Sequence, residues 1–236
     1  MEQPPFSQRL AIVGTTHVNR SSIERVRRTI METRPSVVAV ELDEERLQAL
    51  RDPEREKLSF PIHSGLLPWL LALLERSVGS LTDVFPGSEM LEAVDEAERV
   101  DARIVMIDKP IGTILADLSS VPLLEKCRIA VDVLFALLAI GSRWKATKST
   151  SASLDELMAE FDAKYPTLSR ILVKERDRYM ADRLKEILQS TTGRIVGVVG
   201  LGHVNGITQH LAADDQCSSK EKTGIKYEWT LDTAPR

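Results

Sequence analysis

Short apolar runs alternate with amphipathic stretches along the first third of the chain, and this alternation predicts a parallel α/β fold. Residues 9–13 are predicted as a short strand, and residues 37–40 form a continuous, mostly β-branched run typical of a buried strand. Between them, residues 21–30 begin with a Ser-x-x-Glu capping box and continue with apolar side chains at helical spacing. A strand, a helix and a strand within about thirty residues form a βαβ unit, whose two strands run parallel.

The later part of the chain repeats this pattern less tightly. The further elements predicted are a helix at 88–100, a strand at 104–107, a long amphipathic helix at 167–189 and a strand at 194–199. Regions at about 61–80 and 115–165 show no strand pattern and are predicted as helical insertions. Residues 225–232 alternate strictly between apolar and polar, which is typical of an edge strand. We therefore expect one α/β domain over residues 1–236, with a mainly parallel central sheet, flanking helices and helical insertions.

Composition and charge exclude several classes of protein. The 236 residues are 43% hydrophobic and 28% charged, which are ordinary values for a globular domain and not those of a disordered chain. The formal net charge of −4 argues against a nucleic-acid-binding module. Residues 1–9 contain no apolar leader segment, and no stretch reaches ~18 uninterrupted apolar residues. We therefore expect a cytoplasmic location, no nucleic-acid partner and no membrane-spanning helix in this chain.

A heptapeptide occurs twice, each time at the end of a predicted strand. Residues 13–19 are Val-Gly-Thr-Thr-His-Val-Asn and residues 199–205 are Val-Gly-Leu-Gly-His-Val-Asn. The repeat places two of the four histidines of the chain, His17 and His203, at equivalent positions. Glycines in both copies would let the backbone turn sharply and approach a bound group. These glycines are Gly14, Gly200 and Gly202, and Gly206, directly after the second copy, fits the same interpretation.

Polar side chains follow four of the predicted strands. Glu41 and Asp108 directly follow the second and third strands, whereas His17 and His203 follow the first and fourth. Because open α/β sheets bind ligands at the carboxyl edge of parallel strands, we expect these side chains to converge there. Two imidazoles with one or two carboxylates suit a divalent metal ion that keeps an open position for water. Glu41 could instead favour the start of the following helix, and Asp108 could instead be a cap or pair with Lys109.

Five segments of the chain resemble the TraB/PrgY family, which includes pheromone-shutdown proteins and is related to the Tiki proteases. In order, they are VGTTHVN, RPSVVAVELDEERLQAL, PGSEMLEAVDEAERVDARIVMIDKPI, KERDRYMADRL and VVGLGHVNGI, and they span about residues 9–210. The resemblance implies an α/β core shared with the Tiki, erythromycin-esterase and ChaN-like proteins. It also implies a metal-dependent peptidase centred on two Gly-x-x-His motifs and a glutamate, which here fall on His17, His203 and Glu41.

The resemblance extends to charged residues outside the repeat. The arginine and the Glu-Arg-Asp helix of the family fall on Arg46, Glu175, Arg176 and Asp177. One departure is Asp108-Lys109, because many relatives have Asp-Arg at this point. Many prokaryotic relatives also carry a C-terminal membrane region, so membrane association would belong to a longer native chain.

These observations predict a metal-dependent hydrolase, with a peptide bond as the favoured target. One divalent ion (manganese, cobalt or zinc) would lower the pKa of a bound water. Its ligands would come from His17, His203, Glu41 and Asp108. A carboxylate that does not bind the metal could act as general base. Arg46 or Arg176 would stabilise the oxyanion or hold the peptide terminus. Glu175 is a further catalytic candidate. The alternative is a non-catalytic protein that sequesters a peptide or haem-like ligand in the same cleft.

Two apolar segments, residues 66–74 and 129–140, are too short to span a membrane. Both are apolar on more than one helical face, and such helices are normally buried. We expect them to pack on each other, on a second copy of the chain in a homodimer, or against a membrane surface.

Overall fold

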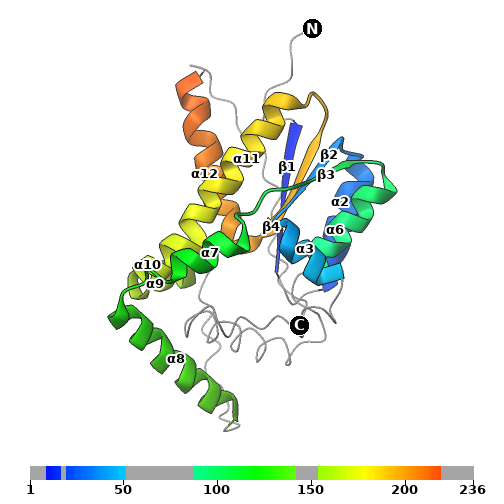
Figure 1. The fold of residues 1–236 in the computed structure, drawn as a ribbon. Helices are drawn as coiled ribbons and strands as arrows, with labels where there is room; N and C mark the ends of the chain where they lie inside the picture. Colours follow the sequence, from blue (N-terminus) through cyan, green and yellow to red (C-terminus); the bar gives the residue numbers. More distant parts are fainter. Residues whose placement is uncertain (1–8, 17–19, 52–87, 142–153, 219–236) are drawn as a thin grey trace.

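The protein is represented by a computed structural model, which describes residues 9–16, 20–51, 88–141 and 154–218 (Figure 1). The predicted insertion at 61–80, the apolar segment 66–74 and the predicted edge strand at 225–232 lie outside these residues, as does His17.

The core of the fold is a four-stranded parallel sheet. Its strands are β1 (Leu10–Thr15), β2 (Val37–Val40), β3 (Arg103–Met106) and β4 (Ile195–Gly200), in the spatial order β1-β4-β2-β3. The predicted α/β class and parallel sheet are therefore confirmed. β4 lies between β1 and β2, and every one of its residues is buried. This order makes the two strands that precede the Gly-x-x-His motifs direct neighbours, with Thr15 opposite Gly200 at their carboxyl ends.

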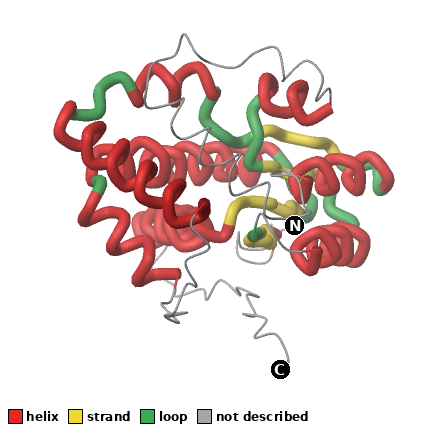
Figure 2. The backbone as a smooth tube through the Cα atoms, turned by 90° about the horizontal axis from the view of Figure 1, so that it is seen from below, coloured by secondary structure: helices red, strands yellow, loops and turns green. Residues whose placement is uncertain are grey.

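Helices cover both faces of the sheet (Figure 2). On one face, α2 (Arg20–Thr33) and α6 (Ser88–Arg99) bury their apolar stripes against the sheet. On the other face lie α11 (Glu175–Ser190) and α12 (Leu201–Ser218). The larger side chains that join the helices to the sheet are Val26, Ile30, Met90 and Val94 on the first face and Met180, Leu184, Ile187 and Ile207 on the second. The molecule is thus a three-layer α/β/α sandwich.

The remaining helices lie beside this sandwich. They are α3 (Glu44–Arg51), α7 (Ile111–Leu118), α8 (Leu123–Gly141), α9 (Leu154–Lys164) and α10 (Pro166–Ser169). A separate apolar cluster joins α7, α8 and α10, with Ile114, Ile129 and Leu168 among its buried members. The described part of residues 115–165 is mainly helical. No helix within the four described ranges has the length and apolar character needed to cross a membrane.

Two local features differ from the sequence prediction. The helical run predicted at 167–189 is interrupted by a π-helical segment, Arg170–Lys174, between α10 and α11. The glycine-rich stretch after β4 was expected to turn sharply, but α12 runs straight through Gly202 and Gly206. Glycine disfavours helix by only about 1 kcal/mol, and burial of Ile207 against the sheet is sufficient to offset that cost.

Candidate functional site

Three of the predicted site residues converge at the carboxyl edge of the sheet. Glu41 follows β2, Asp108 follows β3 by two positions, and His203 lies in the first turn of α12, directly after β4. All three are buried. The geometry of parallel strands therefore brings together residues that are far apart in the sequence.

Arg176, from the first turn of α11, lies at the centre of this group. Its Nε and Nη2 donate to the two oxygens of Asp108 at 2.9 and 2.7 Å, and Nη2 also donates to Oε1 of Glu41. Its Nη1 donates to the main-chain oxygen of Leu172 at 3.1 Å and contacts Nε2 of His203 at 3.1 Å. The planar guanidinium suits this arrangement because it presents its donors as a fixed fork. A single cation thus joins two buried carboxylates and the histidine.

The charges of this cluster shift the pKa values of its members. Burial by itself raises the pKa of Asp108, but the hydrogen bond and charge of Arg176, together with the charge of Arg46, bring it below the usual value. For Arg176, burial lowers the pKa, and the hydrogen bond to Asp108 with the charges of Glu41 and Asp108 raises it above its ordinary range. Both groups are therefore held in their charged forms at neutral pH.

This pairing predicts a loss of stability in acid. Because the pKa of Asp108 is lower in the folded chain than in the unfolded chain, the stabilisation is fully present above the unfolded value near 3.8 and is lost as pH falls through the folded value. We expect the free energy of unfolding, measured in urea, to fall below about pH 4. Asp108→Asn, which cannot titrate at this position, is expected to show a shallower fall. An equally steep fall in this variant would mean that other groups cause the acid sensitivity.

Glu41 is fixed on its other side by the start of α12. Its Oε2 accepts a hydrogen bond from the main-chain N–H of Gly200 at 2.5 Å, so the carboxylate lies at the positive end of the α12 dipole. The sequence alternative, in which Glu41 favours the start of the next helix along the chain, is not what the structure has. That role belongs to Asp43, which accepts from the N–H of Arg46 in α3 and from the N–H of Ile111 in α7 at 2.8 and 2.7 Å.

His203 is held in one orientation by Asp177. Its Nδ1 lies 2.6 Å from Oδ1 of Asp177, a buried residue of α11. Because a carboxylate only accepts and a guanidinium only donates, Nδ1 carries the proton toward Asp177 and Nε2 presents its lone pair to Arg176. Nε2 also lies 3.3 Å from Oε1 of Glu41. The tautomer assigned in this way is the one that can accept a proton at Nε2.

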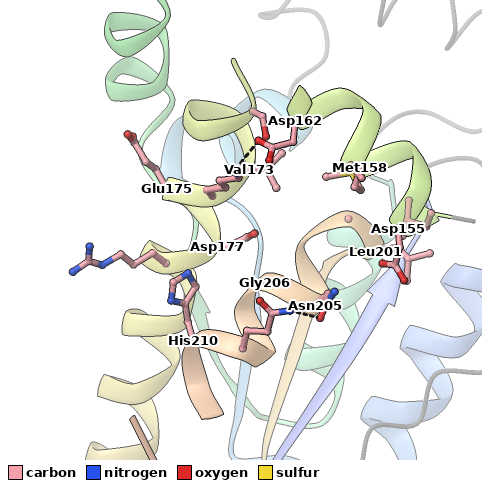
Figure 3. A pocket seen from close by; sticks show the side chains of 17 residues that line it. Asp155, Met158, Asp162, Val173, Glu175, Asp177, Leu201, Asn205, Gly206 and His210 are labelled. Carbon is pink, nitrogen blue, oxygen red and sulfur yellow. Dashed lines mark hydrogen bonds and ion pairs between the residues drawn. The ribbon is translucent and has the colours of Figure 1, made fainter. Parts of the chain in front are cut away.

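Gly206 makes room for the Asp177 carboxylate. A Cβ added at Gly206 would fall against Oδ2 of Asp177 and lie 2.6 Å from its Cγ (Figure 3). At Gly202, one turn earlier on the same helix, an added Cβ would meet only Sδ of Met158 at 3.9 Å.

This contrast provides a matched pair of substitutions. We expect Gly206→Ala to lower the free energy of unfolding by about 1–3 kcal/mol, because the carboxylate or the helix must shift. Gly202→Ala is expected to raise it by up to about 1 kcal/mol through better helix propensity. Urea denaturation of both variants measures the difference. If Gly206→Ala is as stable as Gly202→Ala, Asp177 does not pack against α12 as described.

Of the three glycines predicted to approach a bound group, Gly14 allows close packing and Gly200 bonds to the charged cluster. At Gly14, near the end of β1, an added Cβ would lie 2.9 Å from Leu201 Cδ1 and from Val204 Cγ2, so this glycine lets α12 pack closely on the strand. Gly200 supplies the N–H that binds Glu41. At Gly202 an added Cβ would make only an ordinary contact with Met158. A role in holding a cofactor stays a prediction for all three.

The other predicted residues lie around the cluster. Arg46 donates through Nη1 to Oδ2 of Asp108, and its side chain is 36% exposed, against 12% for Arg176. Glu175 is not in the cluster. It accepts from Lys109 Nζ at 3.1 Å and from Arg170 Nη1 at 2.5 Å. Arg46 is therefore the cation of the site that faces solvent, whereas Glu175 belongs to an outer layer of ion pairs.

A cavity of about 620 Å³ lies on the far side of Asp177, between α9, α11 and α12. Figure 3 shows Asp155 and His210 on opposite sides of it, with Asp177 and Gly206 between them. His203, Glu41 and Arg176 do not line this cavity. Asp177 therefore separates the cavity from the charged cluster.

The carboxylate oxygens that could bind a metal ion in this cluster already accept hydrogen bonds from the chain. Each oxygen of Asp108 already accepts from two donors, and both oxygens of Glu41 are bonded. Within the described parts of the chain, no three His, Cys, Asp or Glu side chains are placed to hold an ion together. The guanidinium of Arg176 lies where a cation would have to bind these carboxylates, so the described residues do not fit a metal ion as arranged.

Two functional contacts escaped the sequence analysis. Asp177 was noted only as part of the Glu-Arg-Asp helix, and nothing in its spacing pointed to His203, which lies 26 positions away. Gly206 was grouped with the other glycines of the motif. The one available signal was that the second histidine motif continues as His-Val-Asn-Gly, which puts a glycine three residues after His203, on the same side of the helix.

Comparison with known proteins matches this chain to one family. The model of the TraB/PrgY/gumN family matches residues 6–216. An uncharacterized protein from Methanocaldococcus jannaschii, MJ1365, is 32% identical over 212 residues, which cover 85% of this chain and 52% of that protein. TraB domain-containing proteins from Bos taurus and Homo sapiens are 31% and 29% identical, each covering 87% of this chain and 63% of the relative. The chain thus spans between half and two thirds of the length of these relatives.

Proposed function

The chain belongs to the TraB/PrgY/gumN family, and on that premise we propose that it is a hydrolase in which His203 activates a water molecule for attack on a peptide bond. The contact that carries this proposal is the hydrogen bond between His203 Nδ1 and Asp177. A carboxylate that orients an imidazole and supports its protonated form is the usual partner of a histidine base. The choice of a peptide bond rests on the resemblance to the Tiki proteases.

In the proposed reaction, a water molecule replaces the Arg176 Nη1 contact at Nε2 of His203, and Nε2 takes one proton from this water as the water oxygen bonds to the scissile carbonyl carbon. The C–N bond then breaks, and the proton held on Nε2 passes to the leaving amine. Asp177 stays ionised and stabilises the imidazolium. Arg46, the exposed cation of the site, would face the developing oxyanion or the substrate carboxylate.

Arg176, Glu41 and Asp108 act in this proposal as positioning residues. Arg176 donates a hydrogen bond to Nε2 of His203 and so keeps the proton of the neutral imidazole on Nδ1. The carboxylates of Glu41 and Asp108 keep Arg176 in place. These roles differ from those predicted from the sequence. There, a carboxylate was the general base, and Arg176 was an alternative to Arg46 for stabilising the oxyanion.

The divalent ion predicted from the sequence stays a prediction, and no step above depends on it. Its measurement is the metal content of protein purified without a polyhistidine tag, together with hydrolysis before and after chelation. One ion per chain and loss of hydrolysis on chelation would assign the ion to this site, with Arg176 displaced. Hydrolysis that survives chelation would support His203 acting without it.

A pair of histidine variants tests the proposed base. His203 and His210 lie on the same helix, but only His203 contacts the cluster. Peptide mixtures would be incubated with the wild type, His203→Ala and His210→Ala, and the products followed by mass spectrometry. We expect the wild type and His210→Ala to cleave peptides, and His203→Ala to lose about 10³-fold or more of the rate.

Three results would contradict the proposal in different ways. Cleavage that survives His203→Ala would remove this residue from the mechanism. Peptide binding without any product, in all three proteins, would favour the sequestering function instead. Equal loss in both variants would indicate a general effect on the fold, which circular dichroism would detect.

A further inference from the structure

The cavity between α9, α11 and α12 is a candidate binding site that lies apart from the charged cluster. Its volume of about 620 Å³ is within the range of pockets that hold small ligands. Charged and polar side chains line it together with an apolar part formed by Leu154, Met158, Val173 and Leu201. The cavity can therefore take a ligand that carries both charged and apolar groups.

Several of the charged side chains along the cavity already have partners. Lys174 Nζ lies 2.6 Å from Oδ1 of Asp162. Glu175 accepts hydrogen bonds from Lys109 and Arg170. Because these charges are balanced within the protein, they contribute little to the choice of a ligand.

Asp177 offers the cavity a carboxylate oxygen without a partner. Its Oδ1 binds His203, but no described residue donates a hydrogen bond to Oδ2. Oδ2 is the atom nearest to the missing Cβ of Gly206, which also lines the cavity and has no side chain to cover it. The side chain of Asp177 is only 6% exposed, and a buried anionic oxygen is stabilised by a charged donor. An ammonium group suits this oxygen.

Two nitrogen-bearing side chains of the same cavity suit a carboxylate. His210 lies one turn after Gly206 on α12, and therefore on the same side of that helix. Arg178 directly follows Asp177 on α11 and, like His210, has no partner among the residues that the structure describes. Figure 3 shows Asp155 on the opposite side of the cavity from His210, so we expect the negative group of a ligand on the His210 side.

We propose that this cavity binds an apolar α-amino acid in its zwitterionic form. The ammonium would bind Oδ2 of Asp177, and the carboxylate would bind Arg178 and His210. The side chain of the ligand would pack toward Leu154 and Met158 of α9. A purely anionic ligand would be repelled by Asp177, and a purely cationic ligand would be repelled by Arg178.

The proposed ligand would touch the same carboxylate that orients His203. Oδ1 of Asp177 holds the imidazole, whereas Oδ2 would hold the ammonium. The cavity and the charged cluster therefore share one residue. Free leucine contains no peptide bond, so its binding can be measured whether or not the proposed hydrolysis occurs.

Isothermal titration calorimetry of the full chain tests the proposal with three probes. The probes are leucine, N-acetylleucine, which lacks the ammonium, and leucinamide, which lacks the carboxylate. We expect the wild type to bind leucine and to bind each analogue at least about tenfold more weakly, because each loses one charge-assisted contact.

Variants of the cavity locate the binding. Asp177→Asn and Arg178→Gln are each expected to weaken leucine binding at least about tenfold. Ala159→Trp, which places a large ring at the α9 wall of the cavity, should abolish it. Asp182→Asn and Arg183→Gln are the matched controls and should bind as the wild type does, because both residues lie on α11 outside the cavity.

Three results would overturn the proposal. The first is no binding of leucine by the folded wild type. The second is binding of N-acetylleucine and leucinamide as tight as that of leucine. The third is wild-type affinity for leucine in both Arg178→Gln and Ala159→Trp, with circular dichroism showing that they are folded. These two variants decide the question even if Asp177→Asn does not fold.

Discussion

Arg176→Met is expected to lower the free energy of unfolding by about 3–5 kcal/mol at neutral pH, because it leaves two buried carboxylates without their cation. Glu41 and Asp108 are 6% and 0% exposed in their side chains, and both contact Arg176 Nη2. Methionine fills similar space but donates no hydrogen bond. The measurement is urea denaturation of the variant and the wild type.

The pH dependence of this variant distinguishes lost charge from lost packing. Without Arg176, burial raises the pKa of Asp108, so this carboxylate takes up a proton more readily in the folded chain. Stability lost at pH 8 should then be partly recovered near pH 5. Arg170→Met, whose side chain is 54% exposed and paired with Glu175, is the control and should cost at most about 1 kcal/mol. A loss for Arg176→Met that is small or independent of pH would contradict the charged cluster.

Asp177→Asn is expected to reduce hydrolysis by about 10³–10⁴-fold, if His203 is the base proposed above. The amide has the size of the carboxylate but lacks the charge that stabilises the imidazolium, and it can turn its NH₂ group toward Nδ1. An asparagine with its oxygen accepting elsewhere and its NH₂ group at Nδ1 would favour the histidine tautomer protonated at Nε2. That tautomer cannot accept a proton from water at Nε2. The rate constant for peptide cleavage measures this effect.

Asp182→Asn is the matched control for this variant. Asp182 lies on the same helix, is exposed, and pairs only weakly with Lys185 at 3.3 Å. Its activity should equal that of the wild type. An unchanged rate in Asp177→Asn would show that Asp177 does not act through His203.

Much of the fold could be predicted because burial imposes simple patterns on the chain. Val37–Val40 is buried on both faces and has the continuous β-branched run expected of such a strand. Glu41 and Asp108 were placed correctly at one edge because position at a strand end depends only on strand direction. The order of the strands in the sheet could not be predicted in this way. β4 lies between β1 and β2 because of contacts between distant segments, which no local sequence pattern encodes.

The candidate site was less predictable because its groups meet through tertiary contacts. Asp177 and His203 lie on two helices whose relative rotation decides whether they touch. α12 was also difficult to recognise as a helix, because Gly202 and Gly206 lower helix propensity in its first two turns. Arg176 was predicted to lie at the site, but its place between two carboxylates follows from the packing of α11 on the sheet.

The π-helical segment Arg170–Lys174 has a consequence for how this protein can change over evolution. A π segment is a local widening that accommodates one extra residue within an α-helix, and here the carbonyl oxygen of Leu172 in that segment receives the Arg176 side chain. Loss of a single codon there would restore regular main-chain hydrogen bonding and remove this acceptor. Selection for a more stable helix and selection for a fixed Arg176 would therefore act in opposite directions on the same codon.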